Sequence, residues 1–134
     1  LIQMKKFLFS TFLISLTTLS ATEALVTKDS LSIKGVEEKI TLLEEKALMA
    51  IHSENYEFME QLLQSGKINS RMKVNGKPLI IHAAIQDKAE MILMLANYGA
   101  MLIEPICDEG KDIMEYATEN NAIYAQAQII VIKA

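Results

Sequence analysis

The chain has 134 residues, about the length of one domain. Hydrophobic residues make up 51% and charged residues 22% of it, proportions that exclude the intrinsically disordered class. The net charge of −4 and an aromatic content of 6%, without tryptophan, argue against nucleic-acid binding, which needs clustered basic residues or aromatic stacking surfaces.

The first residues have the layout of a secretory signal. Two lysines precede a mostly apolar run over 7–19, and small residues follow it. This run is shorter than the roughly 20 residues that span a bilayer, so we expect its removal and no stable membrane anchor afterwards. Cleavage after Ala24 is our prediction, with Ala21 as the open alternative and Met4 as the true start. The lysines and the compact apolar run are typical of bacterial export, which predicts a periplasmic or secreted protein. The expected organisation is a signal peptide over 1–24, a polar linker over 25–40 and a folded domain over 41–134.

A period of 33 to 34 residues runs through the predicted domain. Gly66 and Gly99 are 33 residues apart, and Gly76 and Gly110 are 34 apart. A period of this length is typical of ankyrin and tetratricopeptide repeats. The domain is therefore expected to be a stack of helical repeats.

The segments between these glycines carry helix patterns. Apolar residues at i, i+3 and i+4 predict helices over 57–66 and 90–99, each ending at a glycine suited to the left-handed C-terminal position. Thr41 and Glu44 form a capping-box pattern, which predicts that a first helix begins there and continues to residue 52. The β-branched run at 129–132 conflicts with the final helix that the period requires.

These segments resemble ankyrin repeats. Residues 76–84, Gly-Lys-Pro-Leu-Ile-Ile-His-Ala-Ala, are similar to the ankyrin turn and first helix, and residues 90–100 to its second helix and Gly-Ala stop. Residues 57–66 repeat the second helix, and residues 108–117 begin a further repeat. The resemblance covers about 46–134. It implies an all-α fold: a short ankyrin-type helical-repeat solenoid of about two full repeats plus capping fragments, with hairpin-like turns.

The Thr-Pro-Leu-His signature of the family is not intact. Pro78-Leu79 stand one residue early, and Ile81 occupies the position of the family's histidine, with His82 next to it. The hydrogen bonds that the signature makes between neighbouring repeats are therefore not expected here. A stack of helical hairpins unrelated to ankyrin stays open as the structural alternative.

Residues that could support chemistry are sparse. His52 and His82 are the only histidines, and neither lies in a nucleophile motif such as Gly-x-Ser-x-Gly. A packing role for His82 and a solvated role for His52 are favoured over a shared metal. Cys107 cannot form an internal disulfide, and it lies just before the turn at 108–110, which is expected to be exposed. A mixed or intermolecular disulfide stays open beside an incidental, partly covered cysteine. We predict no enzyme activity, no cofactor and no metal.

The resemblance also implies where a partner binds. Ankyrin-like proteins bind other proteins through hairpin tips and the concave face of the first helices. Carried over to this sequence, the partner-binding residues are His52, Ser53, Val74, Asn75, Lys77, Ile85, Gln86, Asp108, Glu109, Lys111, Glu119 and Asn120. Ile85 is expected to be exposed among polar neighbours. The predicted function is an exported protein-binding module, an adaptor or inhibitor. A secreted effector acting on a host protein is one alternative, and a metal-binding periplasmic protein or enzyme accessory factor is another.

Overall fold

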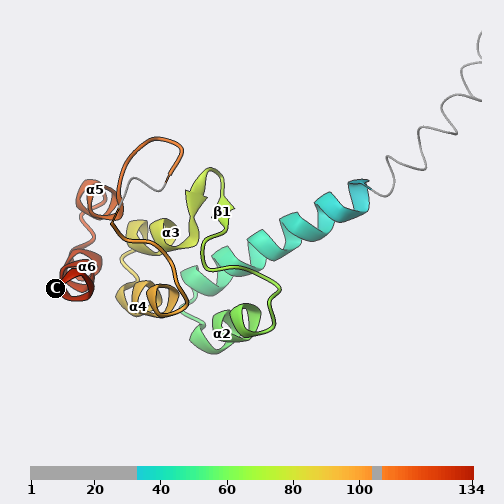
Figure 1. Cartoon of the computed structure of the whole chain (residues 1–134), viewed down its shortest axis with the longest axis horizontal. Coiled ribbons are helices and arrows are strands. Elements are labelled where there is room, and N and C mark those ends of the chain that lie inside the picture. The colour runs from blue at the N-terminus through green and yellow to red at the C-terminus, as the bar shows by residue number, and fades with distance from the viewer. Residues whose placement is uncertain (1–32, 104–106) are drawn as a thin grey trace, which may run out of the picture. The chain divides into compact units, whose positions relative to one another are not determined.

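The computed structural model describes residues 33–103 and 107–134, which are mostly helical. Residues Thr41–Ala134 form one compact unit, and the described residues before Thr41 belong to another. The predicted signal peptide and its cleavage site lie outside the described residues. The elements after the first helix are α2 Tyr56–Gln64, β1 Lys73–Val74, β2 Lys77–Pro78, α3 Leu79–Ile85, α4 Ala89–Asn97, α5 Ile113–Glu119 and α6 Ile123–Lys133 (Figure 1).

The first helix covers residues 33–52 in the described part of the chain. The prediction that it begins at the capping box of Thr41 is therefore wrong, and residues 33–40 are not a loose linker. Ile33, Val36 and Ile40 continue the helical i, i+3, i+4 spacing on the N-terminal side of Thr41. A Thr-x-x-Glu pattern inside such a periodic segment does not mark the start of a helix.

The turn between the helices of a pair recurs with the period seen in the sequence. Left-handed residues stand at Glu54, Asp87 and Asn121, with φ of 54°, 58° and 53°. The backbone N–H of the next residue then bonds to an alanine carbonyl of the preceding helix, Asn55 to Ala50, Lys88 to Ala83 and Ala122 to Ala117, at 2.9, 2.9 and 2.8 Å. All three alanines are buried. A small side chain at this position lets the second helix fold back closely on the first.

The two predicted second helices are confirmed as α2 and α4. Gly66 and Gly99 follow them in the left-handed conformation, with φ of 69° and 96°. The final helix also forms: α6 is helical through the β-branched run, contrary to the conflict expected there. Its Ala125 and Ile129 are fully buried, and α6 contacts α4 and α5. Burial of this apolar face outweighs the weak helix propensity of the β-branched residues.

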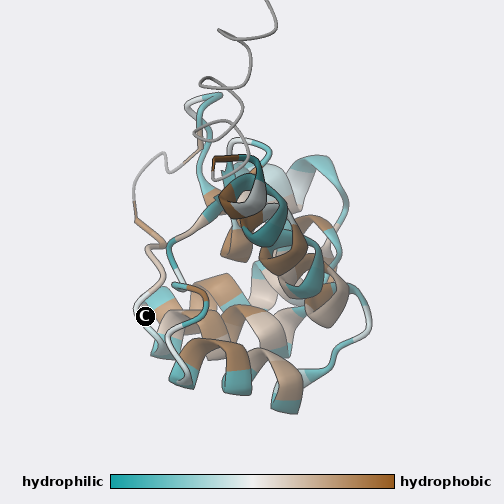
Figure 2. Cartoon of the chain, turned by 90° about the vertical axis from the view of Figure 1, so that its right-hand side faces the viewer, coloured by the Kyte–Doolittle hydropathy of each residue, from teal (hydrophilic) through white to brown (hydrophobic). Residues whose placement is uncertain are grey.

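The core centres on α3, which contacts α4, α5 and the hairpin. The chain between β1 and β2 turns at Asn75 and Gly76, both at positive φ, as a two-residue hairpin requires. The five buried residues of α3 are Leu79, Ile80, Ile81, Ala83 and Ala84. The helices carry both hydrophobic and hydrophilic residues, and hydrophilic residues also occupy several of the turns between them (Figure 2).

Candidate protein-binding surface

The tip of the β1–β2 hairpin is bonded to the loop over 107–112. The backbone N–H of Asp108 donates to the carbonyl of Gly76 at 3.1 Å. Lys73 Nζ lies 2.9 Å from Asp108 Oδ1, and Lys77 Nζ lies 3.2 Å from Glu109 Oε1. Two segments about 34 residues apart in the chain are thereby held at a fixed relative position.

Tyr116 of α5 lies beneath this contact and supports it. Its hydroxyl donates to Glu109 Oε2 at 2.9 Å, and the ammonium groups of Lys77 and Lys111 lie 5.8 and 5.5 Å from its ring centroid. Burial raises the pKa of the Tyr116 hydroxyl far above its usual range, and hydrogen bonds with Cys107 and Glu109 raise it further. The hydroxyl therefore stays protonated and remains a donor at any physiological pH.

Cys107 is buried, although the turn at 108–110 that follows it is exposed. Its Sγ lies 3.3 Å from the Tyr116 hydroxyl, and the backbone N–H of Lys111 donates to it at 3.3 Å. Burial raises the pKa of the thiol, but these hydrogen bonds outweigh burial, so the pKa lies below its ordinary value. A disulfide with another molecule would require the loop to open first.

Glu109 gives this contact a pH dependence. The hydrogen bond from Tyr116, followed by that from Lys77, holds the pKa of the Glu109 carboxyl below its ordinary value of 4.5. A lowered carboxyl pKa stabilises the fold above the unfolded-state pKa, and that contribution is lost as the pH falls through the folded-state pKa. We therefore expect the wild type to be more stable than Glu109→Gln near neutral pH, with the difference shrinking as the pH falls below 4.5. Urea unfolding of both proteins across this range measures the difference, and a difference that does not change with pH would contradict the assignment.

The ends of the first helices form a second polar row. His52 Nδ1 lies 3.1 Å from Gln86 Oε1, and these two residues and Asn120 follow one another at intervals of 34. Lys88 Nζ lies 2.9 Å from Glu54 Oε1 in the adjacent turns. Side chains at equivalent positions of the first and second helix pairs are thus bonded directly to each other.

The third helix pair has its own contacts at this row. Lys111 Nζ lies 3.0 Å from Glu119 Oε2, and Asn120 Nδ2 donates to the carbonyl of Tyr116 at 2.9 Å. The side chain of Asn120 therefore completes the C-terminal end of α5 instead of reaching out freely.

The structure places most, though not all, of the predicted partner-binding residues at the surface. The exposed ones are His52, Ser53, Asn75, Asp108, Glu109, Glu119 and Asn120, and the half-buried ones are Lys77, Ile85, Gln86 and Lys111. Val74 is only 4% exposed, so its placement at an open tip is wrong: its side chain points inward because alternate residues of a strand face opposite sides. Ile85 is not exposed either, because it packs against the core as the last residue of α3.

Two contacts within the helical unit were missed by sequence reasoning. The hydroxyl of Tyr98 donates to Glu60 Oε1 at 2.9 Å and accepts from Gln64 Nε2 at 3.1 Å. Gln64 and Tyr98 are 34 residues apart, so the repeat period alone could have indicated that they are neighbours. In the second contact, the carboxylate of Asp87 accepts the backbone N–H of Ala125 at 2.7 Å.

The Asp87 contact caps a helix from outside it. The N-cap residue of α6 is Ala122, whose side chain makes no capping bond. Asp87, in the turn of the preceding helix pair, supplies the missing acceptor and places a negative charge at the positive end of the α6 dipole. No local pattern in the sequence marks such a cap.

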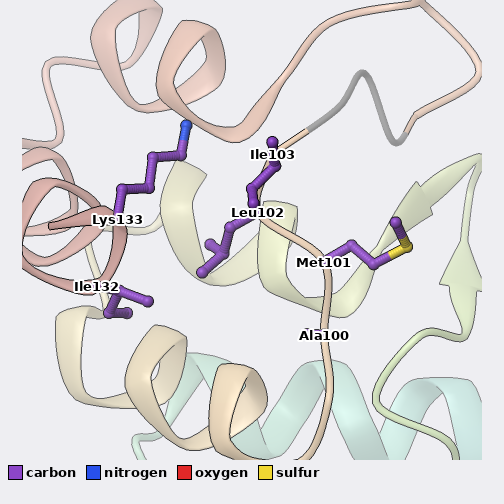
Figure 3. A pocket seen from close by; sticks show the side chains of 6 residues that line it. All are labelled: Ala100, Met101, Leu102, Ile103, Ile132 and Lys133. Carbon is purple, nitrogen blue, oxygen red and sulfur yellow. The ribbon is translucent and has the colours of Figure 1, made fainter.

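An apolar groove of about 570 Å³ lies between α6 and the segment over 100–103. Leu102 and Ile132 point toward one another across it (Figure 3). Its remaining lining residues are Ala100, Met101, Ile103 and Lys133. With Lys133 as the one ionisable lining residue, the groove brings together no acid and base that could act on a substrate.

The two histidines do not meet. His82 Nε2 lies 2.8 Å from the carbonyl of Val74, so His82 joins α3 to the hairpin as a packing residue, whereas His52 bonds to Gln86. Within 33–103 and 107–134, no three His, Cys, Asp or Glu side chains are grouped to hold a metal ion. In the same ranges, no helix is both long and apolar enough to cross a membrane.

The sequence was compared with models of known protein families and with curated proteins. No model of a known protein family matches the chain, and a search of curated proteins finds no significant match.

Proposed function

We propose that this chain is an exported protein-binding module of the ankyrin-repeat type, which acts as an adaptor or inhibitor and not as an enzyme. Its binding site is the tip surface, defined as the exposed part of the hairpin tip and the loop over 107–112 together with the helix ends at His52, Gln86 and Asn120. The observation that supports this most directly is the bonding between successive tips, from Gly76 to Asp108.

The hydrogen bonds and ion pairs between neighbouring tips matter for affinity. Each side chain or loop that becomes ordered when a partner binds lowers the conformational entropy and so weakens binding. Here Lys73 and Lys77 are already held by carboxylates of the next loop, and His52 by Gln86. A surface that is ordered before binding loses less conformational entropy on association and so binds more tightly for a given area. The tip surface carries both positive and negative side chains, which favours selection among partners by charge complementarity.

The recurrence of the turn at Glu54, Asp87 and Asn121 supports a repeat architecture for this surface. Stacked repeats display their turns as a continuous row, and an extended row suits a protein surface better than a small molecule. Secretion into the periplasm or the medium, inferred from the sequence of residues 1–24, would place the partner outside the cytoplasm.

The test is a binding experiment with the purified chain as bait in a periplasmic extract of the source cell. A tip variant carries His52→Ala, Asn75→Gly and Gln86→Ala; glycine keeps the positive φ at Asn75. A control variant carries Glu57→Ala, Gln61→Ala and Asn97→Ala, three exposed residues of α2 and α4. Circular dichroism first verifies that both variants keep the helical content of the wild type.

We expect one protein to be retained in stoichiometric amount by the wild type and the control, and at least about tenfold more weakly by the tip variant. Loss of three contacts worth about 0.5 to 1 kcal/mol each accounts for that factor. Equal retention by the two variants would show that the partner binds elsewhere. Retention of no protein by any of the three baits would contradict an adaptor for a periplasmic partner.

A further inference from the structure

We infer that the exposed face of α6 docks a second copy of this chain about a twofold axis at Ala127. This face carries four large apolar side chains in open solvent. Ile123, Tyr124, Ile130 and Val131 are 71%, 72%, 61% and 68% exposed. Large apolar side chains gathered on one face of a helix are normally covered by another element or by a partner.

Ala127 lies at the centre of this face. Successive helix residues are about 100° apart, which places Ala127 directly opposite the buried pair Ala125 and Ile129 once their directions are averaged. Ile123 and Tyr124 precede Ala127 by one helical turn, and Ile130 and Val131 follow it by one turn. The large side chains are therefore disposed symmetrically around a small one.

This symmetry makes the face complementary to itself. When two α6 helices lie antiparallel with their Ala127 residues opposed, Ile123 of one copy lies beside Ile130 of the other, and Tyr124 lies beside Val131. Each contact occurs twice, as a closed twofold interface requires. The alanine at the axis lets the backbones approach closely, so the flanking side chains can interlock.

The charge distribution agrees with a self-association. The only Lys, Arg, Asp or Glu side chain of α6 is Lys133 in its last turn, so antiparallel helices keep the two lysines at opposite ends of the contact. No Lys, Arg, Asp or Glu lies on the face itself, so none has to be buried there.

The size of the face fits a weak dimer. The four side chains leave on the order of 500 Å² of apolar surface per chain, as large as the largest patch on a typical monomer. A dimer would bury roughly 1,000 Å² in total from these side chains, at the lower limit for a specific interface. The expected dimer is therefore reversible and depends on protein concentration. It uses none of the tip surface, so it stands or falls independently of the proposed function.

Sedimentation equilibrium of the purified chain at increasing concentration tests this inference. We expect a monomer–dimer equilibrium in the wild type. Ala127→Glu, which opposes two carboxylates at the axis, should weaken the dimer at least about 100-fold. Ile130→Asp, at a second position of the face, should have the same effect. Both positions are exposed, and circular dichroism verifies that each variant is folded.

A matched control changes another exposed isoleucine. Ile33→Glu places the same charge on the first helix, where Ile33 is exposed, and should leave the dimer unchanged. A wild type that stays monomeric at the highest concentration, or a dimer that survives both α6 substitutions, would overturn the proposal. A dimer weakened only by Ile33→Glu would assign self-association to the first helix and overturn it equally.

A cross-link tests the position of the axis. Ala127→Cys should form a disulfide between copies under mild oxidation, because residues on a twofold axis between close helices fall within the separation a disulfide spans. Glu90→Cys, on the exposed part of α4, should not, and neither should the wild type, whose Cys107 is buried. Equal cross-linking of the two introduced cysteines would exclude an axis at Ala127.

Discussion

Replacing Ile80 by alanine is expected to lower the free energy of unfolding by about 2 to 5 kcal/mol, the range for deletion of a buried isoleucine side chain that leaves a cavity. Ile80 is fully buried in α3, the helix that contacts α4, α5 and the hairpin. Small domains are stable by only about 5 to 15 kcal/mol, so this loss is a large fraction of the total. Urea unfolding followed by circular dichroism measures it.

The control for this prediction is Ile103→Ala. Ile103 is 81% exposed, so the same truncation should change the free energy of unfolding by less than about 0.5 kcal/mol. Similar losses for the two variants would mean that α3 does not form the centre of the core.

Replacing Asp87 by alanine is expected to lower the free energy of unfolding by about 2 to 3 kcal/mol. Two losses combine: alanine is strained at the φ of 58° by about 1 kcal/mol, and the backbone N–H of Ala125 loses its acceptor, at a cost of about 1 to 2 kcal/mol. Because the bond joins the α3–α4 turn to α6, hydrogen exchange in the first turn of α6 should also accelerate.

Two further variants separate these losses. Asn121→Ala places alanine at the equivalent turn, with φ of 53°, and should cost only the conformational part, about 1 kcal/mol. Asp87→Asn keeps both the tolerance for positive φ and an acceptor oxygen, so it should cost less than Asp87→Ala. Equal losses for Asp87→Ala and Asn121→Ala would show that the bond to Ala125 contributes nothing.

Features set by neighbouring residues were predictable from the sequence. Gly66 and Gly99 marked the ends of α2 and α4 because glycine tolerates the left-handed conformation that ends a helix. The apolar spacing identified both helices because one face of each must be buried. Ala83 and Ala117, spaced by the period, coincide with the carbonyls that accept the turn hydrogen bonds.

The candidate binding surface was predictable only in part. The resemblance to ankyrin repeats implied that Asn75, Asp108 and Glu109 lie at hairpin tips, and all three are exposed. The burial of Val74 and the partial burial of Ile85 were not foreseen, because both depend on how a two-residue strand and a helix end are oriented toward the core. The ion pairs between Lys73, Lys77 and the next loop were likewise not foreseen, since charged residues in turns have many possible neighbours in the sequence.

The sequence by itself determined the period, the second helices and the glycine turns, because each depends on propensities and spacings within a few residues. The tertiary structure alone decided that the β-branched end of the chain is helical, that Asp87 caps α6 and that the hairpin tip is bonded to the next loop. These features join residues about 30 to 40 positions apart, and their free energy comes from burial and hydrogen bonds that exist only after the helix pairs have packed. The conformational preference of individual residues is too weak to determine such contacts. In α6, burial of Ala125 and Ile129 outweighs the preference of the β-branched residues against a helix.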